Sequence, residues 1–302
     1  MSRQSTITPD GRWYKGNTHA HTNLSDGALT PGELVDRYKA MGYDFTAITD
    51  HRTYGIHQDL SDADFLVLPG VELDCGAAAG AGFCHHVVGL GLPGANDLVH
   101  GQKIIYPDNT TVEALIELLT RHGNLCLYAH PAWSHVRHEV LDTVEGFVGL
   151  EVYNNVCEVC CACGFSESYY DRLLWQGRRI WCLASDDTHQ HMRDYGGGFI
   201  MVKAAELTHQ SIVQALLAGS FYASQGPLIE DFHVEDNQAY LQCSPCRSIG
   251  FQNDNNPGDA LIDDAAGLTS GTCQLTGREH YIRAICTDAA GKRAWTQPVW
   301  LS

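Results

Sequence analysis

Histidine and carboxylate side chains recur in short clusters along the first two thirds of the chain, and side chains of these types bind metal ions. The first cluster is His19-Ala20-His21, with Asp26 in the loop that follows. The later clusters are Thr49-Asp50-His51, Gly70-Val71-Glu72, His85-His86, Ala129-His130-Pro131 and Asp186-Asp187-Thr188-His189. Imidazole and carboxylate groups together suit zinc, manganese or iron. One His-x-His pair is a weak indication, but a series of such clusters is hard to explain by packing.

Most of these clusters lie at the ends of short apolar runs that are typical of buried strands. The runs cover residues 45–48, 65–68, 125–128, 149–152 and 180–183. Predicted capping boxes begin helices at Thr30 and Thr110, and two further helices are expected over 166–176 and 208–218. Alternating strands and helices predict an α/β fold around a mostly parallel sheet. In a β/α barrel, the carboxyl ends of the strands carry the active site.

After about residue 228 the pattern changes to strands alone. Strand candidates at 239–243, 248–251, 281–286 and 294–301 are separated by turn-rich segments. We therefore predict two domains, with residues 1–227 forming the α/β part and residues 228–302 forming a small, all-β, sandwich-like part.

The charge of the chain limits its partners. Its 302 residues include 36 acidic and 19 basic side chains, for a net charge of −17. No basic patch is visible, which argues against a nucleic-acid polymer as partner. A small anionic substrate is still compatible with this charge, because bound metal cations can reverse the local electric field. No apolar run reaches the roughly 18 residues of a membrane span, and the N-terminus lacks an apolar signal core, so we expect a cytoplasmic protein.

Twelve cysteines are present, and four of them cluster at Cys157, Cys160, Cys161 and Cys163. Without a secretion signal, reduced thiols are favoured over a disulfide framework. The cluster resembles half of a zinc knuckle, and Cys243 with Cys246 could supply the other half. Free thiols on a loop are the preferred interpretation, and a second, structural zinc is the alternative.

The order of these motifs resembles that of the PHP (polymerase and histidinol phosphatase) superfamily. The similarity covers residues 14–225 and includes Ser-Asp-Gly, Glu-Val-Tyr-Asn and Asp-x-His in the expected order. The segment 214–227 and the β-rich tail look like the branch of carbaryl-hydrolase-like enzymes. The resemblance implies a distorted seven-stranded (β/α) barrel with a small C-terminal β-sandwich-like domain.

The resemblance also implies two to three divalent transition-metal ions (Zn, Mn or Fe). His19, His21, Glu72 and Asp187 would hold one ion, and Glu72 would bridge to a second ion. The other expected ligands are His86 and His130 for the second ion and Asp26, His51 and His189 for the third. His86 is preferred to His85 because it directly precedes the Val-Val-Gly run, and Asp187 is preferred to Asp186 because of the Asp-x-His motif.

The expected function is a metal-dependent hydrolase, with a phosphoesterase favoured. It would cleave a small phosphomonoester or nucleotide through a metal-bound hydroxide. Asp187 and His189 are the candidates for proton transfer, and Arg52 and Asn154 are candidates for substrate binding. Hydrolysis of a carboxylic ester, carbamate or amide at the same centre is the first alternative. A non-enzymatic metal-binding module is the second.

Overall fold

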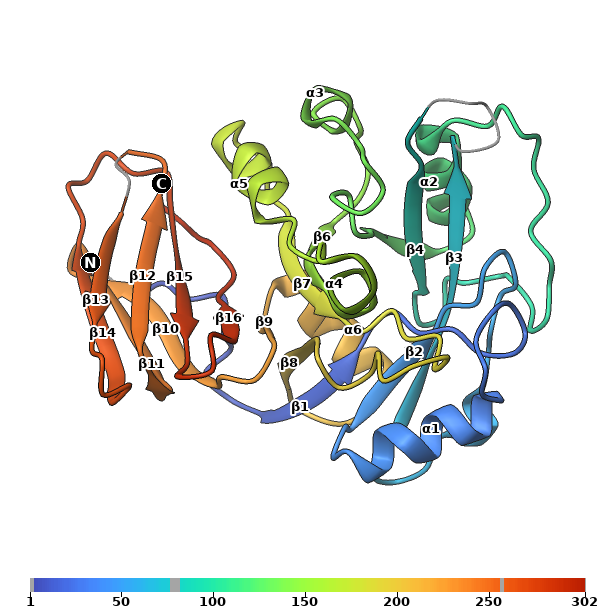
Figure 1. The fold of residues 1–302 in the computed structure, drawn as a ribbon, viewed down its shortest axis with the longest axis horizontal. Helices are drawn as coiled ribbons and strands as arrows, with labels where there is room; N and C mark the ends of the chain where they lie inside the picture. The colour runs from blue at the N-terminus through green and yellow to red at the C-terminus, as the bar shows by residue number, and fades with distance from the viewer. Residues whose placement is uncertain (1–2, 77–81, 256–257, 302) are drawn as a thin grey trace.

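The structure, a computed structural model, describes residues 3–76, 82–255 and 258–301. Strands and helices alternate in its first part (Figure 1). The strands are β1 (Arg12–Asn17), β2 (Phe45–Ile48), β3 (Leu66–Cys75), β4 (His85–Gly91), β5 (Asn124–Tyr128), β6 (Gly149–Asn154), β7 (Trp181–Ser185), β8 (Phe199–Ala204) and β9 (Phe221–Ser224). The helices are α1 (Pro31–Ala40), α2 (Val112–Arg121), α3 (His138–Leu141), α4 (Asn155–Cys161), α5 (Glu167–Trp175) and α6 (His209–Ala218), with a 3₁₀ turn η1 (Gln58–Leu60).

These strands form one curved sheet in the order β9-β8-β1-β2-β3-β4-β5-β6-β7. The runs β1-β2-β3 and β5-β6-β7 are parallel, whereas β4 is antiparallel to β3 and β5, and β8 is antiparallel to β1 and β9. The far strand β7 contacts β8 and β9, so the sheet curls back toward its own beginning. The predicted α/β class is confirmed, and the number of barrel strands stays a prediction.

Helix ends follow local capping chemistry. Thr30 caps α1, and its side chain and that of Glu33 make the reciprocal bonds of a capping box. Ser166 and Thr208 precede α5 and α6, as expected. The expected cap of α2 was one residue off, because Thr111 rather than Thr110 accepts the backbone N–H, in this case that of Ala114. None of the helices in the described ranges has the length and apolar character needed to cross a bilayer.

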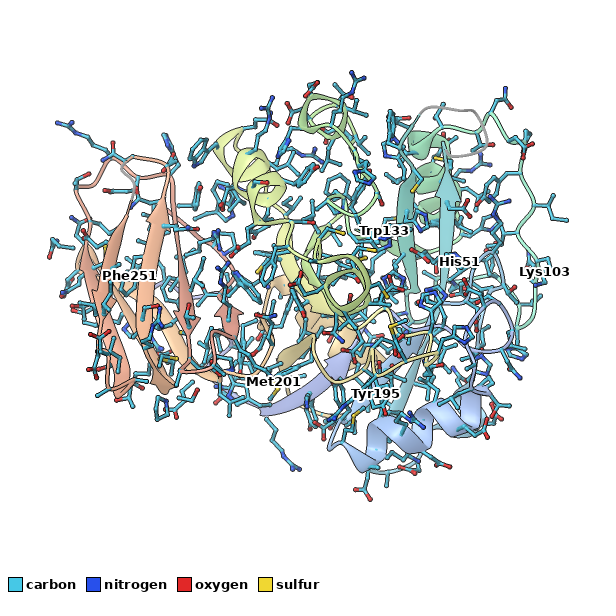
Figure 2. The ribbon with its side chains drawn as sticks, in the orientation of Figure 1. His51, Lys103, Trp133, Tyr195, Met201 and Phe251 are labelled. Atoms are coloured by element: carbon cyan, nitrogen blue, oxygen red, sulfur yellow. The ribbon has the colours of Figure 1, made fainter. Side chains whose placement is uncertain are left out.

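Beyond residue 228, the described residues form strands and no helix. They are β10 (Ile229–Glu235), β11 (Gln238–Cys246), β12 (Ser248–Asn253), β13 (Asp259–Ile262), β14 (Leu268–Gln274), β15 (Tyr281–Thr287), β16 (Arg293–Trp295) and β17 (Val299–Trp300). Strands β10, β11 and β14 form a separate three-stranded sheet in the order β10-β11-β14. The strands β12, β13, β15 and β16 extend the large sheet, because β16 pairs with β9. The two sheets share a core that includes Phe232, Leu241, Ile249 and Phe251. Phe251 lies far from His51 and Trp133 in Figure 2.

Helix α5 connects the first part of the chain to these C-terminal strands through ion pairs. The guanidinium of Arg283 on β15 is fully buried and bonds to the Asp171 carboxylate on α5. Arg293 also pairs with Glu167 on α5, but the Arg293 side chain is 40% exposed. The contact between α5 and the C-terminal sheet therefore includes a charged group that has no access to water.

We predict that Asp171→Ala destabilises the protein by about 3 kcal/mol, because it strands the Arg283 guanidinium in the core without its counter-charge. Urea unfolding measures this as a lower transition midpoint. Asp142→Ala is the matched control, because Asp142 pairs with Arg172, whose side chain is 48% exposed, and it should cost no more than about 1 kcal/mol. Equal losses in the two variants would refute the prediction.

Candidate metal centre

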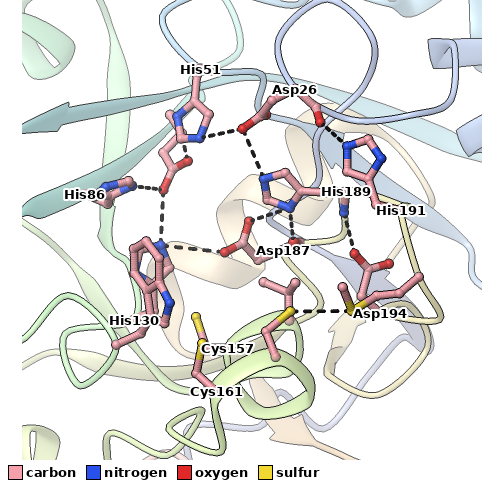
Figure 3. A pocket seen from close by; sticks show the side chains of 15 residues that line it. Asp26, His51, His86, His130, Cys157, Cys161, Asp187, His189, His191 and Asp194 are labelled. Atoms are coloured by element: carbon pink, nitrogen blue, oxygen red, sulfur yellow. Dashed lines mark hydrogen bonds and ion pairs between the residues drawn. The ribbon is translucent and has the colours of Figure 1, made fainter.

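The histidine and carboxylate clusters meet at one end of the curved sheet. His130 and Asp187 follow the carboxyl ends of β5 and β7 by two residues, and His51 follows the carboxyl end of β2 by three. His86 lies near the start of β4, but β4 is antiparallel to its neighbours, so its beginning lies at that same end. Topology alone therefore brings residues from most of the chain to one site (Figure 3).

Glu72 is the centre of the cluster. It lies within β3, is only 1% exposed, and its carboxylate faces imidazole nitrogens on both oxygens. Oε1 lies 2.8 Å from His86 Nδ1 and 3.3 Å from both His19 Nε2 and His130 Nε2. Oε2 lies 3.1 Å from His51 Nδ1 and 3.3 Å from His21 Nε2. One carboxylate is thus in a position to bridge several metal ions.

Asp187 completes a buried group with His19, His21 and Glu72. Its Oδ1 lies 3.0 Å from His21 Nε2 and 3.2 Å from His19 Nε2, yet this buried oxygen has no hydrogen-bond partner in the structure. The two Nε2 atoms are themselves 3.2 Å apart. Buried polar atoms normally have partners, so an orphaned carboxylate oxygen facing two imidazole nitrogens fits a bound cation.

Two further groups of candidate ligands share residues with this buried group. His21, Asp26, His51 and His189 form one set of ligand atoms that lie within 4.8 Å of one another, and His51, Glu72 and His86 form another. Asp26 Oδ2 lies 3.5 Å from His189 Nε2 and 3.7 Å from His51 Nε2. The buried Nδ1 of His51 has no hydrogen-bond partner. The nine predicted ligands therefore lie together. One group has the residues predicted for the first ion, and another has those predicted for the third ion together with His21. His86 and His130, predicted for one ion, fall into different groups, and the assignment to three ions stays a prediction.

The electrostatics of the cluster favour positive charge at its centre. Burial lowers the pKa of His21, but Asp187 and Glu72 outweigh it and raise this pKa to about 9. Burial also opposes protonation of His86, whose pKa Glu72 raises to about 10. Burial disfavours the charged form of Glu72, but His19 and neighbouring imidazoles hold its pKa well below the ordinary value. A metal ion can take the place of the protons that these groups attract.

Backbone strain accompanies the site. Asp187 and His130 adopt positive φ angles of 50° and 28°, which side chains other than glycine rarely adopt. Each residue follows the end of a strand by two positions, and both side chains lie near Glu72. Strain of this kind costs roughly 1–3 kcal/mol and concentrates at functional sites.

Glu151 and Asn154 form hydrogen bonds that hold the candidate ligands in place. Glu151 Oε1 accepts a hydrogen bond from His19 Nδ1 at 2.9 Å, which leaves Nε2 of that ring free to face Asp187 and Glu72. Asn154 donates from Nδ2 to Glu151 Oε2 at 2.8 Å and to Asp187 Oδ2 at 3.1 Å. Its Oδ1 caps α4 at the Cys157 N–H. Asn154 is fully buried, so we do not propose the predicted substrate contact for it.

Arg52 also turns away from the cavity. Its guanidinium makes two bonds of 2.8 Å to the Asp74 carboxylate and lies over the Tyr106 ring. It is not among the described residues that line the cavity at the metal centre. The expected substrate contact of Arg52 is therefore not proposed further.

In each of the neighbouring pairs His85-His86 and Asp186-Asp187, only one side chain faces the metal centre. His85 points to the other face of β4, where its Nδ1 forms a hydrogen bond with the Tyr128 hydroxyl, whereas His86 faces Glu72. Asp186 accepts backbone N–H groups from Gly196, Gly197 and Gly198 at 2.7–2.9 Å, so its carboxylate holds a loop in place. The preferred residues His86 and Asp187 are the ones that the structure brings to the centre.

A cavity of about 410 Å³ opens over the cluster (Figure 3). Most of the candidate ligands line it, and the other lining residues are Trp133, Val156, Met192, His191, Asp194 and thiols of α4. The Trp133 ring lies beside the candidate ligand His130, with ring centres 5.0 Å apart. No lysine or arginine is among the described lining residues. The thiols are Cys157, Cys160 and Cys161.

Helix α4 was not predicted from the sequence. The Cys157–Cys163 cluster was expected on a loop, but α4 carries its first three members. Asn154 supplied a capping signal, but the helix ends at Ala162 with a φ of 53° rather than at a glycine. The usual C-terminal signal was therefore absent.

We predict that Glu151→Gln weakens metal binding about 10–100-fold. Both Glu151 oxygens accept hydrogen bonds, so the NH2 group of a glutamine would face donors at one of the two positions and disturb the orientation of the His19 ring. Competition against a chromophoric chelator measures the affinity. Glu145→Gln is the control, because the Glu145 side chain is 77% exposed and lies outside the cluster. Unchanged affinity in the Glu151 variant would contradict a positioning role.

Comparison with known proteins places the fold. No protein-family model matches the chain. An uncharacterized protein of Methanocaldococcus jannaschii is 35% identical over 18% of this chain and 31% of its own length, so the match spans less than a third of that relative. A two-domain protein from Bacteroides vulgatus, described as containing a predicted PHP-like metal-dependent phosphoesterase, superposes with a TM-score of 0.52 and 17% identity over 95% of each chain. The chain shares the fold of that protein.

A second solved structure is less similar. An amidohydrolase from Chromobacterium violaceum, with bound sulfate and no metal, has a TM-score of 0.44 and 17% identity over 59% of this chain and 89% of its own.

Proposed function

We propose that this chain is a metal-dependent hydrolase whose His, Asp and Glu cluster binds two to three divalent transition-metal ions. The observation that carries the proposal is the buried Asp187 Oδ1, which has no hydrogen-bond partner and faces the Nε2 atoms of His19 and His21. Such an arrangement is costly unless a cation lies between these atoms. The fold shared with the Bacteroides vulgatus protein supports the proposal.

The ligands would divide into overlapping groups. His19, His21, Glu72 and Asp187 would hold one ion, and Glu72 would also serve an ion near His86 and His130. The remaining ligands, Asp26, His51 and His189, would hold a third ion together with His21. Bound divalent ions supply an activated water molecule near neutral pH and polarise the oxygen of the scissile group.

Protein groups around the cavity would control the proton. His189 Nδ1 lies 2.8 Å from the Asp187 backbone carbonyl and donates to it, so the Nε2 lone pair faces Asp26. Asp187 is held by Asn154 through Oδ2, which leaves Oδ1 directed at the cluster. We propose that His189 Nε2 and the buried Asp187 Oδ1 are the two positions that either bind a metal ion or accept a proton.

The favoured reaction is hydrolysis of a small phosphoester, because clustered divalent ions suit phosphoryl transfer. A specific observation favours a second candidate, the hydrolysis of a carboxylic ester, carbamate or amide. The described lining contains no lysine or arginine, and it includes the apolar side chains of Trp133, Val156 and Met192. A phosphomonoester would meet no cationic side chain there, whereas an apolar acyl or aryl group would meet complementary surface.

Activity of the metal-loaded protein on a substrate panel tests the proposal. The panel contains p-nitrophenyl phosphate, bis-p-nitrophenyl phosphate, naphthyl acetate and a naphthyl carbamate, and Glu72→Gln controls for contaminating hydrolases. Turnover of a phosphate substrate supports the phosphoesterase, and turnover of the carboxylic substrates alone replaces it with the second candidate. Bound metal without turnover of any substrate would favour the metal-binding module.

We also propose that residues 1–227 and 228–302 are distinct domains, the first a barrel of seven principal strands. A core cluster made mostly of residues from the C-terminal strands supports this division, and it also takes in Ile7 and Tyr222 from the first range. The extreme N-terminal segment lies against the second part, since Gln4 pairs with Val234 on β10 and Ser5 Oγ donates to the Phe232 carbonyl.

A further inference from the structure

Three buried cysteines converge in the C-terminal part of the chain, well away from the cavity. Cys243 and Cys246 lie on β11, and Cys286 lies on β15. They are 3%, 0% and 0% exposed, and their sulfur atoms lie within 4.8 Å of one another. All three are free thiols. Sulfur atoms that share one metal ion at about 2.3 Å are roughly 4 Å apart, so this cluster has the dimensions of a metal–thiolate site.

An irregularity in β11 is needed to bring two of these thiols together. Cys243 and Cys246 are three residues apart, and in a regular strand their side chains would point to opposite faces. The pairing of β11 with β14 shifts between Gln242 and Cys246, at a segment that contains Pro245. The alternation of buried and exposed side chains shifts there too, so both cysteines face the core.

The cluster links two different sheets. β11 belongs to the three-stranded sheet β10-β11-β14, whereas β15 belongs to the large sheet. Cys286 pairs in register with Ile249 of β12 and Ala294 of β16, so it is a central position of that sheet. An ion held by all three sulfurs would join the two sheets across their shared core (Figure 1).

We propose that Cys243, Cys246 and Cys286 form a second metal site, which binds one thiophilic cation of the Cu(I) or Zn(II) class through three thiolates. No histidine, aspartate or glutamate joins this group among the residues that the structure describes, and an all-sulfur set suits soft ions. Each thiol loses its proton to solvent when the ion binds. The alternative zinc site that pairs Cys243 and Cys246 with the Cys157–Cys163 cluster does not form, because Cys157 lies at the cavity.

Metal titration of the reduced full-length chain in the absence of oxygen tests this site. Cu(I) is delivered against a chromophoric Cu(I) chelator, Zn(II) is titrated in a parallel arm, and Cd(II) reports thiolate ligation through its ultraviolet charge-transfer band. We expect the wild-type chain to take up one thiolate-bound ion and Cys286→Ala to lose the charge-transfer band. Tighter retention of Cu(I) or of Zn(II) against the chelator identifies the ion.

Cys273→Ala is the matched control, because Cys273 is a buried cysteine of β14 in the same core but lies outside the cluster. It should bind the ion like the wild type. Circular dichroism checks that each variant folds. If Cys286→Ala does not fold, X-ray absorption at the copper edge of the wild-type Cu(I) form decides, with a shell of three sulfur atoms expected. A nitrogen or oxygen shell, no uptake by the wild type, or equal behaviour of the two variants would overturn the proposal.

Discussion

Glu72→Gln should lower hydrolytic activity at least about a thousandfold, which corresponds to roughly 4 kcal/mol of lost transition-state stabilisation. Glu72 is 1% exposed, and its two oxygens lie within 3.3 Å of nitrogens from five histidines. Glutamine keeps the shape of the side chain but removes the charge that the proposed ions share. It also points an N–H group at imidazole nitrogens that must face a cation. Steady-state rates and metal content per chain measure both effects.

Glu117→Gln is the control for this variant, because the Glu117 side chain on α2 is 71% exposed. It removes the same charge from the surface and should leave rates and metal content unchanged. Circular dichroism must show that the Glu72 variant is folded. A folded Glu72→Gln protein with wild-type activity would eliminate the proposed centre, whereas a variant that binds metal normally but is inactive would restrict Glu72 to the reaction itself.

Removal of metal by a chelator should abolish activity and lower the melting temperature by roughly 5 °C. An ion present at about a hundred times its Kd stabilises the folded state by about 2.7 kcal/mol, and a chain of this size shifts by a few degrees per kcal/mol. Without the ion, the buried carboxylates of Glu72 and Asp187 face each other across the same histidines. Restoring zinc, manganese or iron should restore both properties.

The Glu72→Gln variant separates this centre from any other metal site. Its melting temperature should change little on chelation, because its centre is already impaired, whereas Glu117→Gln should respond like the wild type. Scanning fluorimetry with and without chelator makes the comparison. An equal shift in Glu72→Gln and in the wild type would place the stabilising ion elsewhere and contradict the prediction.

Elements with local signals were the most accessible to prediction from the sequence. The capping box at Thr30 and Glu33 predicted the start of α1 at the observed residue, because capping depends on side chains three positions apart. α4 was missed, because Ala162 ends it in the left-handed conformation where a glycine would have marked the end. β11 was predicted over 239–243, but its irregular extension to Cys246 depends on pairing with β14 and was not predictable.

The sequence by itself determined which ligand types are present and the order in which the chain supplies them. Most of the candidate ligands lie at the end of an apolar run, so the local pattern also indicated that these residues gather at one end of a sheet. Tertiary structure decided which atoms actually face one another. Arg52 turns to Asp74, Cys286 joins Cys243 and Cys246, and Glu72 receives five histidines. Such contacts depend on sheet register and on packing between distant segments, which a local pattern does not specify.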